Sequence, residues 1–413
     1  MSSQSTKDKP FIIVGAGIVG SALAAYLSED RSNGPILLID RSFSEILGST
    51  SYAPGFLGQY NESSVLTKLA VDSLNEYDRF PEVFQRVGGL ELASTDDGID
   101  KLRDRFTKAQ HAGLSARLLA GEDMSRVVPA FVDRQSFKEA LYFDTDGVAD
   151  PKVLCQMYRD LAKQNGVKTM EADIKDFVVE NSLVRGVRTD TGDIIRAKSV
   201  VYATGIWTSS LLQEAVQMPV PAVPVAHPYV YTGKEDARNQ TPFCRWPEDH
   251  VYARDHGNRY GIGSYAHPPV HVKSLDSTAS KEWPQPEFAH VIAHATASKV
   301  SSTSKLGELA DTKTLSDDNN TKKINGIFSV TPDNLPLLGR VPGVDNLWLA
   351  TGIWITHAAG CARLLTRMVC GEKYDEGIAR ALEPARFVAG DSRELEATAL
   401  RQYNDIYRSK LGT

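Results

Sequence analysis

Three closely spaced glycines near the start of the chain have the spacing of a nucleotide-binding turn. Residues 15–20 read GAGIVG, which places Gly15, Gly17 and Gly20 in a G-x-G-x-x-G pattern. In such a pattern the first glycine permits a tight turn, the second lets the backbone approach a pyrophosphate, and the third lets a helix pack closely on a strand. The amino end of the helix that follows would then face the phosphate charge.

An acidic residue lies at the distance that this pattern requires. Asp40 ends the apolar run at 36–39, about twenty residues after Gly20, where a carboxylate can bind ribose hydroxyls. Glycines alone also make ordinary turns, but here an apolar run at 11–14 precedes them and residues 21–28 have helical character. Together these features predict a strand, a turn, a helix and a second strand that bind the nucleotide end of NAD or FAD.

Two further segments could contact a cofactor. Residues 48–55 (GSTSYAPG) place small hydroxylated side chains at the start of a helix, where they could bind a second phosphate. A loop with a helix cap is the alternative. Residues 351–360 (TGIWITHAAG) follow an apolar strand at 347–350 and lead into a helix. The positive end of that helix could stabilise an anionic reduced flavin.

The elements that must position these segments are of two kinds. Runs at 177–179, 183–188 and 194–197 are joined by short polar turns, which predicts an antiparallel meander. Residues 200–205 (VVYATG) predict another buried strand that ends in a glycine turn. The chain thus combines buried parallel strands with antiparallel ones.

The composition is that of an ordinary globular protein. Of 413 residues, 42% are hydrophobic and 24% are charged, and this length suits two or three domains. The net charge of -6 shows no excess of basic residues, so nucleic acid is not an expected partner. No apolar run reaches the roughly 18–20 residues that cross a bilayer. Four cysteines without C-x-x-C spacing favour reduced structural thiols over disulfides or a metal site.

In their order along the chain, these segments resemble the D-amino-acid oxidase-like flavoproteins, and more specifically the dimethylglycine and sarcosine dehydrogenase and oxidase group. The resemblance runs from about residue 11 to about residue 407. Its most specific segments are 48–55, 227–232 (HPYVYT), 260–267 (YGIGSYAH) and 354–357 (WITH). It implies FAD as the cofactor and a small secondary or tertiary amine, or an N-methyl amino acid, as the substrate.

Two departures from the family bear on how FAD is held. Members with a covalent flavin have a histidine where this chain has Tyr52, and monomeric sarcosine oxidases use a cysteine at the position that matches Gly326. Both known anchors are missing, so the resemblance implies non-covalent FAD. Larger relatives continue into a folate-binding domain, which would begin about where this chain ends. We therefore expect that formaldehyde made here has no built-in acceptor.

The resemblance also implies a fold that combines α/β and α+β parts. A discontinuous, Rossmann-like FAD-binding domain is expected at 10–80, 144–212 and 326–375, and a substrate domain with an antiparallel sheet at 81–143 and 213–325. A C-terminal helical tail is expected at 376–413. Within it, residues 392–410 predict a solvated helix with Tyr403 and Tyr407 on one face.

The resemblance assigns catalysis to His227 and Tyr260, which match the family's active-site histidine and its paired tyrosine. A histidine can take or orient an ammonium proton, because its usual pKa of about 6.5 lies near working pH. Without the resemblance, a satisfied half-buried histidine and an ordinary strand tyrosine are the alternatives. Trp354 and His357 could wall the pocket, with core packing as the alternative for Trp354, and His267 is expected at the surface or in a structural role. The residues expected to bind FAD are Gly15, Gly17, Ile18, Val19, Gly20, Asp40, Arg41, Ser49, Thr50, Ser51, Tyr52, Ile174, Thr204, Gly205, Trp207, Gly352, Ile353, Trp354, Thr356 and His357.

Two alternatives to an amine-oxidising enzyme stay open: a non-catalytic flavoprotein-like subunit on the same scaffold, and an enzyme that oxidises a hydroxy acid. Electrons are expected to pass to oxygen or to an electron-transfer protein, and no nucleic acid or membrane partner is expected. The segment Ser409-Lys410-Leu411 is a peroxisomal signal only at a free C-terminus, and two residues follow it. The sequence as written therefore predicts a cytoplasmic protein, and a peroxisomal one only if those two residues are not native.

Overall fold

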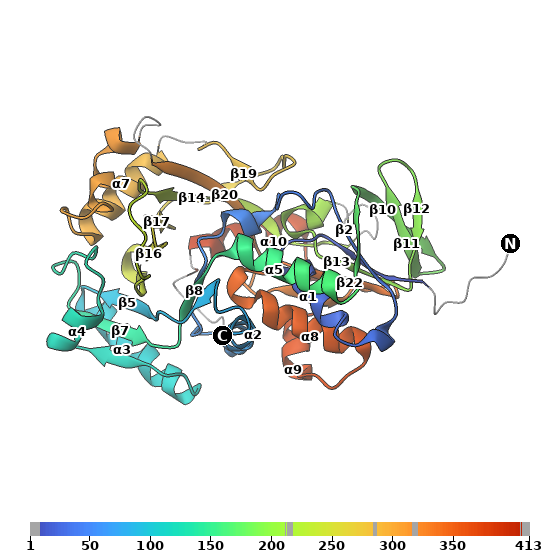
Figure 1. Ribbon diagram of the computed structural model, residues 1–413, viewed down its shortest axis with the longest axis horizontal. Helices are drawn as coiled ribbons and strands as arrows, with labels where there is room; N and C mark the ends of the chain where they lie inside the picture. Colours follow the sequence, from blue (N-terminus) through green and yellow to red (C-terminus); the bar gives the residue numbers. More distant parts are fainter. Residues whose placement is uncertain are drawn as a thin grey trace.

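A computed structural model describes residues 9–210, 212, 218–283, 287–315, 321–404 and 406 of the chain. Two large sheets occupy opposite halves of an elongated molecule (Figure 1). Each sheet is built from segments that lie far apart in the sequence. Among the described residues, no helix is long and apolar enough to cross a membrane.

The first sheet contains the predicted nucleotide-binding strands. Its spatial order is β21 (Leu337–Arg340), β22 (Leu347–Thr351), β13 (Ser199–Tyr202), β1 (Phe11–Val14), β2 (Ile36–Asp40) and β9 (Lys168–Glu171). All neighbours are parallel except β21, which runs antiparallel to β22. All four residues of β1 are buried, as expected for a strand covered on both faces.

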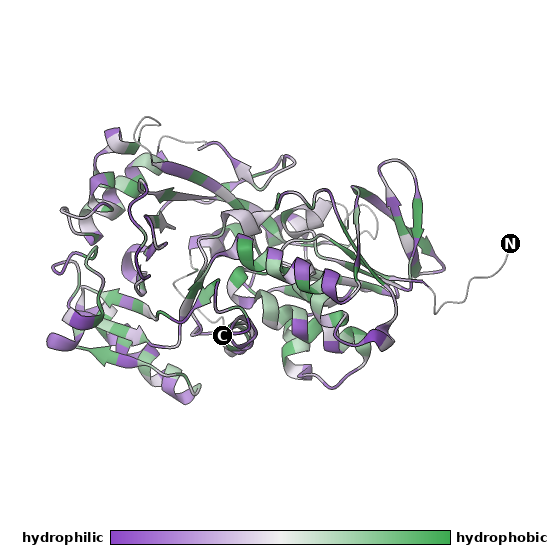
Figure 2. Cartoon of the chain, viewed as in Figure 1, coloured by the Kyte–Doolittle hydropathy of each residue, from purple (hydrophilic) through white to green (hydrophobic). Residues whose placement is uncertain are grey.

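Helices and a small meander cover this sheet. On one face α1 (Ile18–Leu27) packs against α5 (Pro151–Gln164) and α8 (Ala358–Cys370). Figure 2 shows both hydrophilic and hydrophobic residues along α5, whose apolar side packs on α1. On the other face lies the meander β10 (Ile174–Glu180), β11 (Leu183–Thr189) and β12 (Ile194–Arg196), which is antiparallel as predicted.

The second sheet has ten strands and is antiparallel except where β15 runs parallel to β5. Its spatial order is β19 (Ser280–Lys281), β20 (Lys322–Val330), β14 (Val223–Tyr231), β17 (Tyr260–Ser264), β16 (Val251–Asp255), β15 (Phe243–Trp246), β5 (Gly89–Ala93), β7 (Glu139–Phe143) and β6 (Arg117–Leu119), and β18 (Val270–His271) pairs with β14. These two sheets confirm the predicted combination of α/β and antiparallel parts.

Side chains alternate across the second sheet and give it two different faces. Leu90, Leu92, Trp246 and Ala253 point to one face, where they pack with α7 (Glu287–Lys299) in an apolar core. Their neighbours in sequence point to the other face, which looks toward the first sheet. This second face carries the polar residues described below.

Smaller elements join the two sheets. They are η3 (Ser49–Tyr52), β3 (Phe56–Leu57), α2 (Ser64–Tyr77), β4 (Phe84–Gln85), α3 (Asp96–His111), α4 (Glu122–Val127), β8 (Gly147–Ala149), η4 (Gly205–Trp207) and η9 (Ile355–His357). The predicted domain boundary at residue 326 falls inside β20, all of whose residues pair with β14. All of β20 thus belongs to the second sheet, and the predicted division into domains stays a prediction.

The C-terminal segment contains the predicted helix, which is largely exposed and packs on the second sheet along one face. It forms α9 (Glu376–Leu382) and α10 (Ser392–Asn404), and α10 packs on β14 and β20. Tyr403 is fully buried among aromatic residues of the second sheet. Tyr407 lies outside the described residues, so its predicted place on the same face stays a prediction.

Candidate functional site

A cavity of about 1400 Å³ lies between the two sheets. It runs from the glycine turn after β1 to the polar face of the second sheet and onward to α3. Pockets for small ligands usually measure about 300–1,000 Å³. The cavity therefore has room for a dinucleotide together with a small substrate.

The glycines at one end of the cavity have the roles that their spacing predicts. Gly15 has a φ of +101°, and a Cβ there would lie 2.4 Å from the Ala203 carbonyl oxygen. A Cβ on Gly20 would lie 1.8 Å from the Gly15 oxygen, so Gly20 lies beneath the turn and does not line the cavity. At Gly17 the nearest atom would be Thr50 Oγ1, at 3.4 Å. The backbone is therefore open to a ligand at Gly17.

Two charged side chains hold this turn. Asp40, at the end of β2, accepts a hydrogen bond from the Ala16 amide at 2.5 Å and also lines the cavity. Arg159 of α5 donates from Nε and Nη2 to the Ala16 carbonyl oxygen, at 3.0 and 2.7 Å. Arg159 lines the cavity and places a positive charge near the expected pyrophosphate. Sequence reasoning missed it, because no spacing connects α5 with the glycine turn.

The segment at 48–55 forms a short 3-10 turn and not the start of an α-helix. Ser49, Thr50 and Tyr52 line the cavity, and Thr50 Oγ1 accepts a hydrogen bond from the Ile18 amide at 3.2 Å. Ser51 does not line the cavity, because its hydroxyl donates to the Ile46 carbonyl oxygen. The predicted contact of Ser51 with the cofactor stays a prediction.

The other expected cofactor residues all reach the cavity. They are Ile18, Val19, Arg41, Ile174, Thr204, Gly205, Trp207, Gly352, Ile353, Trp354, Thr356 and His357. The glycine cradle, Asp40 and the amino end of α1 suit the adenosine and pyrophosphate parts of FAD. The segment before α8 lines the opposite end, where a flavin ring would lie. The residues present therefore fit FAD along its whole length.

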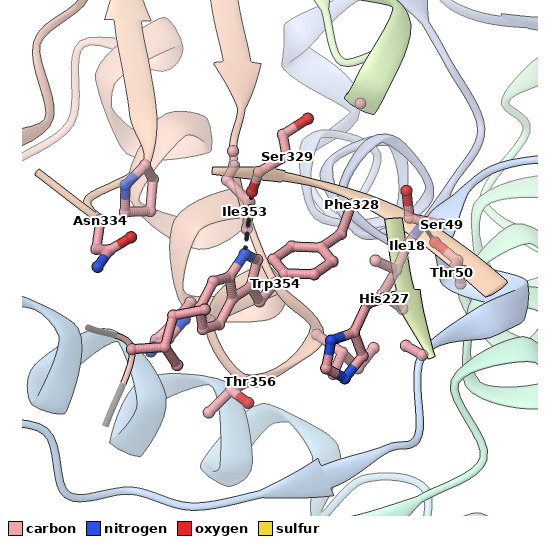
Figure 3. Close-up of a pocket in the computed structure, with 18 of the residues that line it drawn as sticks. Ile18, Ser49, Thr50, His227, Phe328, Ser329, Asn334, Ile353, Trp354 and Thr356 are labelled. Carbon is pink, nitrogen blue, oxygen red and sulfur yellow. Dashed lines mark hydrogen bonds between the residues drawn. The ribbon is translucent and has the colours of Figure 1, made fainter. Parts of the chain in front are cut away.

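Aromatic side chains form the wall at this flavin end (Figure 3). Phe328 lies between Trp354 and His227, with ring centroids 5.6 and 5.8 Å away. The Trp354 indole donates to the Ser329 carbonyl oxygen at 3.3 Å. Burial lowers the pKa of His357 to about 4, so this histidine is neutral at neutral pH. Trp354 and His357 thus both line the pocket, which is the first of the alternatives given for them above.

His227 is held by two tyrosines. Its Nε2 lies 2.6 Å from the Tyr252 hydroxyl, and its Nδ1 lies 2.8 Å from the Tyr403 hydroxyl. The Tyr403 hydroxyl is also 2.8 Å from His267 Nε2, and His267 Nδ1 is 2.8 Å from the Pro268 carbonyl oxygen. The chain of contacts begins at the cavity, which Tyr252 and His227 line, and ends at a backbone carbonyl.

The Pro268 carbonyl at the end of this series of hydrogen bonds determines which atom donates in each of them. Burial lowers the pKa of both His227 and His267, so both imidazoles are neutral. A carbonyl can only accept, so His267 carries its hydrogen on Nδ1 and accepts on Nε2. Tyr403 must then donate to His267 and accept from His227 Nδ1. His227 is left with a bare Nε2, which accepts the hydrogen of Tyr252.

Tyr260 lies elsewhere, which corrects its predicted pairing with His227. Its ring packs under the Arg238 guanidinium at 4.0 Å and against Phe131, and Tyr260 does not line the cavity. Tyr252, on the neighbouring strand, occupies the position beside the histidine. The sequence offers several tyrosines near residue 260, and only strand register distinguishes them.

His267 and Tyr403 are the residues whose role the sequence did not indicate. His267 was expected to be structural or at the surface, and it is buried in this network. Tyr403 was expected to pack on one face of a solvated helix, but no contact with His227 was expected. Their part in the site depends on α10 packing against β14, a contact between segments more than 170 residues apart.

Comparison with known proteins agrees with this geometry. A family model described as FAD dependent oxidoreductase matches residues 11–368. Human mitochondrial dimethylglycine dehydrogenase is 25% identical over 86% of this chain, and 4-methylaminobutanoate oxidase (formaldehyde-forming) of Paenarthrobacter nicotinovorans is 27% identical over 87%. The chain spans only 42% and 43% of those two proteins.

A solved structure shows the same fold. L-proline dehydrogenase from P. horikoshii superposes with a TM-score of 0.79 at 21% identity, over 93% of this chain and 99% of that one. The family match covers most of the chain and includes the glycine turn, Asp40 and the segment before α8. The chain therefore belongs to the family of FAD dependent oxidoreductases.

Proposed function

We propose that this protein oxidises a small secondary or tertiary amine at the end of the cavity where Tyr252 and His227 meet. The observation that carries the proposal is the proton arrangement of this pair. Tyr252 gives its hydrogen to His227, so its oxygen presents lone pairs as a hydrogen-bond acceptor. An acceptor in an aromatic pocket suits the N–H of an amine. The two relatives above, which are named for N-methylated substrates, support the same chemistry.

The pocket residues would bind and orient the amine. Bound FAD would accept a hydride from the carbon next to nitrogen. The Tyr252 oxygen would hold the nitrogen, and His227 Nε2 could take the Tyr252 hydrogen when the ammonium group loses its proton. Because burial disfavours a charged His227, we propose that the pair holds this proton only transiently. Trp354 and Phe328 would keep water away during hydride transfer, and a water molecule that enters afterwards would hydrolyse the imine to an aldehyde and the dealkylated amine.

An anaerobic screen tests the proposal. Candidate secondary and tertiary amines, N-methyl amino acids and hydroxy acids would each be mixed with holoprotein while the flavin absorbance near 450 nm is followed. Bleaching by amines supports the proposal. Bleaching by hydroxy acids alone would replace it with the second enzyme class, and no bleaching by any compound would favour a non-catalytic flavoprotein.

We further propose that FAD is bound non-covalently. Tyr52 and Gly326 both line the cavity, and a Cβ on Gly326 would lie 3.1 Å from the Tyr52 Cβ. The two positions at which relatives attach the flavin are therefore neighbours here, and neither carries the attaching residue. Among the described residues no cysteine lines the cavity. Acid precipitation should release intact FAD into the supernatant, and flavin that stays with the pellet would contradict the proposal.

A further inference from the structure

Arg254 is a buried cation close to the proposed amine site. It follows Tyr252 by two residues on β16, so both side chains point to the same face of the sheet, about 7 Å apart along the strand. Only 3% of Arg254 is exposed. Tyr252 lines the cavity, whereas Arg254 lies behind the cavity wall.

The backbone of residues 54–55 separates Arg254 from the cavity. Nη1 of Arg254 donates to the carbonyl oxygens of Pro54 and Ala149, at 2.5 and 2.9 Å. Pro54 and Gly55 both line the cavity. Gly55 has a φ of +74°, and a Cβ there would lie 2.7 Å from Arg254 Nη1. The guanidinium group therefore packs directly on the backbone that forms this part of the wall.

The hydrogen bonds of Arg254 all go to neutral acceptors. Besides the two carbonyl oxygens above, Nη2 donates to Gln240 Oε1 at 3.0 Å and Nε donates to the Asp255 carbonyl oxygen at 3.2 Å. The carboxylate of Asp255 instead binds Arg238, at 3.1 and 3.2 Å. The carboxylate of Asp150 accepts two backbone amides at the start of α5. In the part of the chain that the structure describes, no carboxylate forms an ion pair with Arg254.

The positive charge of Arg254 is therefore largely uncompensated. Burial lowers the pKa of Arg254, but a guanidinium group stays protonated at neutral pH. His256, just after β16, is neutral, because burial and the charges of Arg254 and Arg259 lower its pKa. A buried charge acts over a longer range than an exposed one, since little water screens it. The cavity beside Pro54 and Gly55 thus lies close to an uncancelled positive charge.

We propose that Arg254 raises the reduction potential of bound FAD by stabilising the negative charge of the reduced flavin. A flavin that takes up two electrons and one proton gains one negative charge, and a nearby cation lowers the free energy of that form. The proposal rests on the proposed amine oxidation for the position of the ring. Direct hydride transfer requires the ring to lie next to the amine, and so next to Tyr252 and the wall at 54–55. Arg254 would act through this wall without touching the substrate.

Gln240→Glu tests the proposal by supplying the carboxylate that Arg254 lacks. The new side chain has nearly the same shape and keeps the acceptor for Nη2. We expect it to lower the equilibrium constant for flavin reduction about tenfold, which is about 30 mV for a two-electron couple. Equilibration of the holoprotein with a redox dye measures this constant. Asn239→Asp is the matched control, because it adds the same charge at the adjacent, exposed position, where water screens it.

Two variants of Arg254 itself separate charge from packing. Arg254→Gln removes the charge and should lower the equilibrium constant about tenfold, whereas Arg254→Lys keeps the charge and should stay within about threefold of the wild type. A second measurement involves no electrons: the pKa of the N3–H group of the oxidised flavin, followed by absorbance. It should rise in Gln240→Glu and Arg254→Gln, because loss of this proton also makes the ring an anion.

A purely structural role for Arg254 gives a different result. Gln240→Glu would then keep the wild-type reduction potential and the wild-type N3–H pKa, and this would overturn the proposal even if Arg254→Gln does not fold. An equal shift in Asn239→Asp would overturn it as well. Both measurements use holoprotein without any amine. A failure to oxidise amines would therefore contradict the proposed function, while the dye equilibrium still decides whether Arg254 sets the potential.

Discussion

The two ends of the cavity are built by different means. At the nucleotide end, the backbone makes the site: Gly15 and Gly20 allow a turn that no Cβ would permit, and Asp40 holds it. At the substrate end, side chains make the site, and they come from strands and a helix far apart in the chain. His227, Tyr252 and Tyr403 meet only because β14, β16 and α10 pack together.

This difference explains which end the sequence reveals. A backbone site leaves a local pattern, since the glycines must stand at fixed spacing between a strand and a helix. A side-chain site leaves no such pattern, because its members need only share a face after folding. We therefore expect single substitutions to act differently at the two ends: on cofactor binding at the first, and on rate or specificity at the second.

The largest effect is expected at the nucleotide end. Gly20→Val would push side-chain atoms into the Gly15 carbonyl, since even a Cβ would lie 1.8 Å from that oxygen. The purified variant should contain less than about a tenth of the wild-type FAD, given what overpacking of a close contact does. Gly377→Ala, in α9, should keep a full complement. The amount of flavin per polypeptide, measured from absorbance, tests both expectations. A Gly20→Val variant with a full complement of FAD would show that the glycine turn is not needed to bind the cofactor.

A smaller effect, on rate alone, is expected at the substrate end. His227→Ala should keep FAD but slow anaerobic flavin reduction by an amine about 10²–10⁴-fold, the usual range for a group that handles a proton. If His227 only packs against the sheet, the variant should instead lose stability and flavin while the remaining holoprotein reacts at a near-normal rate. Stopped-flow rates per bound flavin distinguish these outcomes.

Tyr403→Phe tests whether α10 belongs to the site. The variant keeps the ring and loses the oxygen that accepts from His227 Nδ1 and donates to His267. His227 could then carry its hydrogen on either nitrogen, so we expect flavin reduction about tenfold slower and a changed pH profile. His271, whose Nδ1 pairs with Glu396 at 3.2 Å, offers the control: His271→Gln touches α10 outside the network and should leave the profile as it is.

A separate effect concerns stability and involves the buried carboxyl group of Asp146. The pKa of Asp146 rises from an ordinary value of 3.8 to about 7 through burial, so folding favours its protonated form. Its contribution to stability is complete below about pH 4 and is lost as the pH rises through 7. Between these limits the wild type should lose at most about 4 kcal/mol relative to Asp146→Asn. Urea unfolding at pH 5 and pH 8 measures this, and parallel changes in both proteins would contradict it.

The main strands of the first sheet and the glycine turn could be predicted from the sequence, but Arg159, which holds that turn, could not. The strands at Phe11–Val14, Ile36–Asp40 and Ser199–Tyr202 lie where apolar runs predict them. Two local details could not be predicted: the Ser51 hydroxyl donates to the Ile46 carbonyl oxygen, and β20 continues past residue 326. Both depend on contacts with segments that the local pattern does not contain.

Only some of the residues at the substrate end could be predicted from the sequence. The resemblance indicated His227, but it also indicated Tyr260 as the partner of this histidine. In the structure, the register of β16 beside β17 places Tyr252 next to His227 instead. Tyr252 and His267 have no neighbours in sequence that distinguish them from other tyrosines and histidines. Strand register and helix docking decide their roles, and neither follows from residue spacing.

We propose that Tyr252, bonded to His227, is the tyrosine that contacts the substrate amine. The most direct measurement is the rate of anaerobic flavin reduction, per bound flavin, in Tyr252→Phe and Tyr260→Phe. Both variants remove one hydroxyl and keep the ring, and Tyr260 lies outside the cavity. We predict a reduction about 10–100-fold slower for Tyr252→Phe and a rate within twofold of wild type for Tyr260→Phe. A normal rate in flavin-replete Tyr252→Phe, or a larger loss in Tyr260→Phe, would contradict the account.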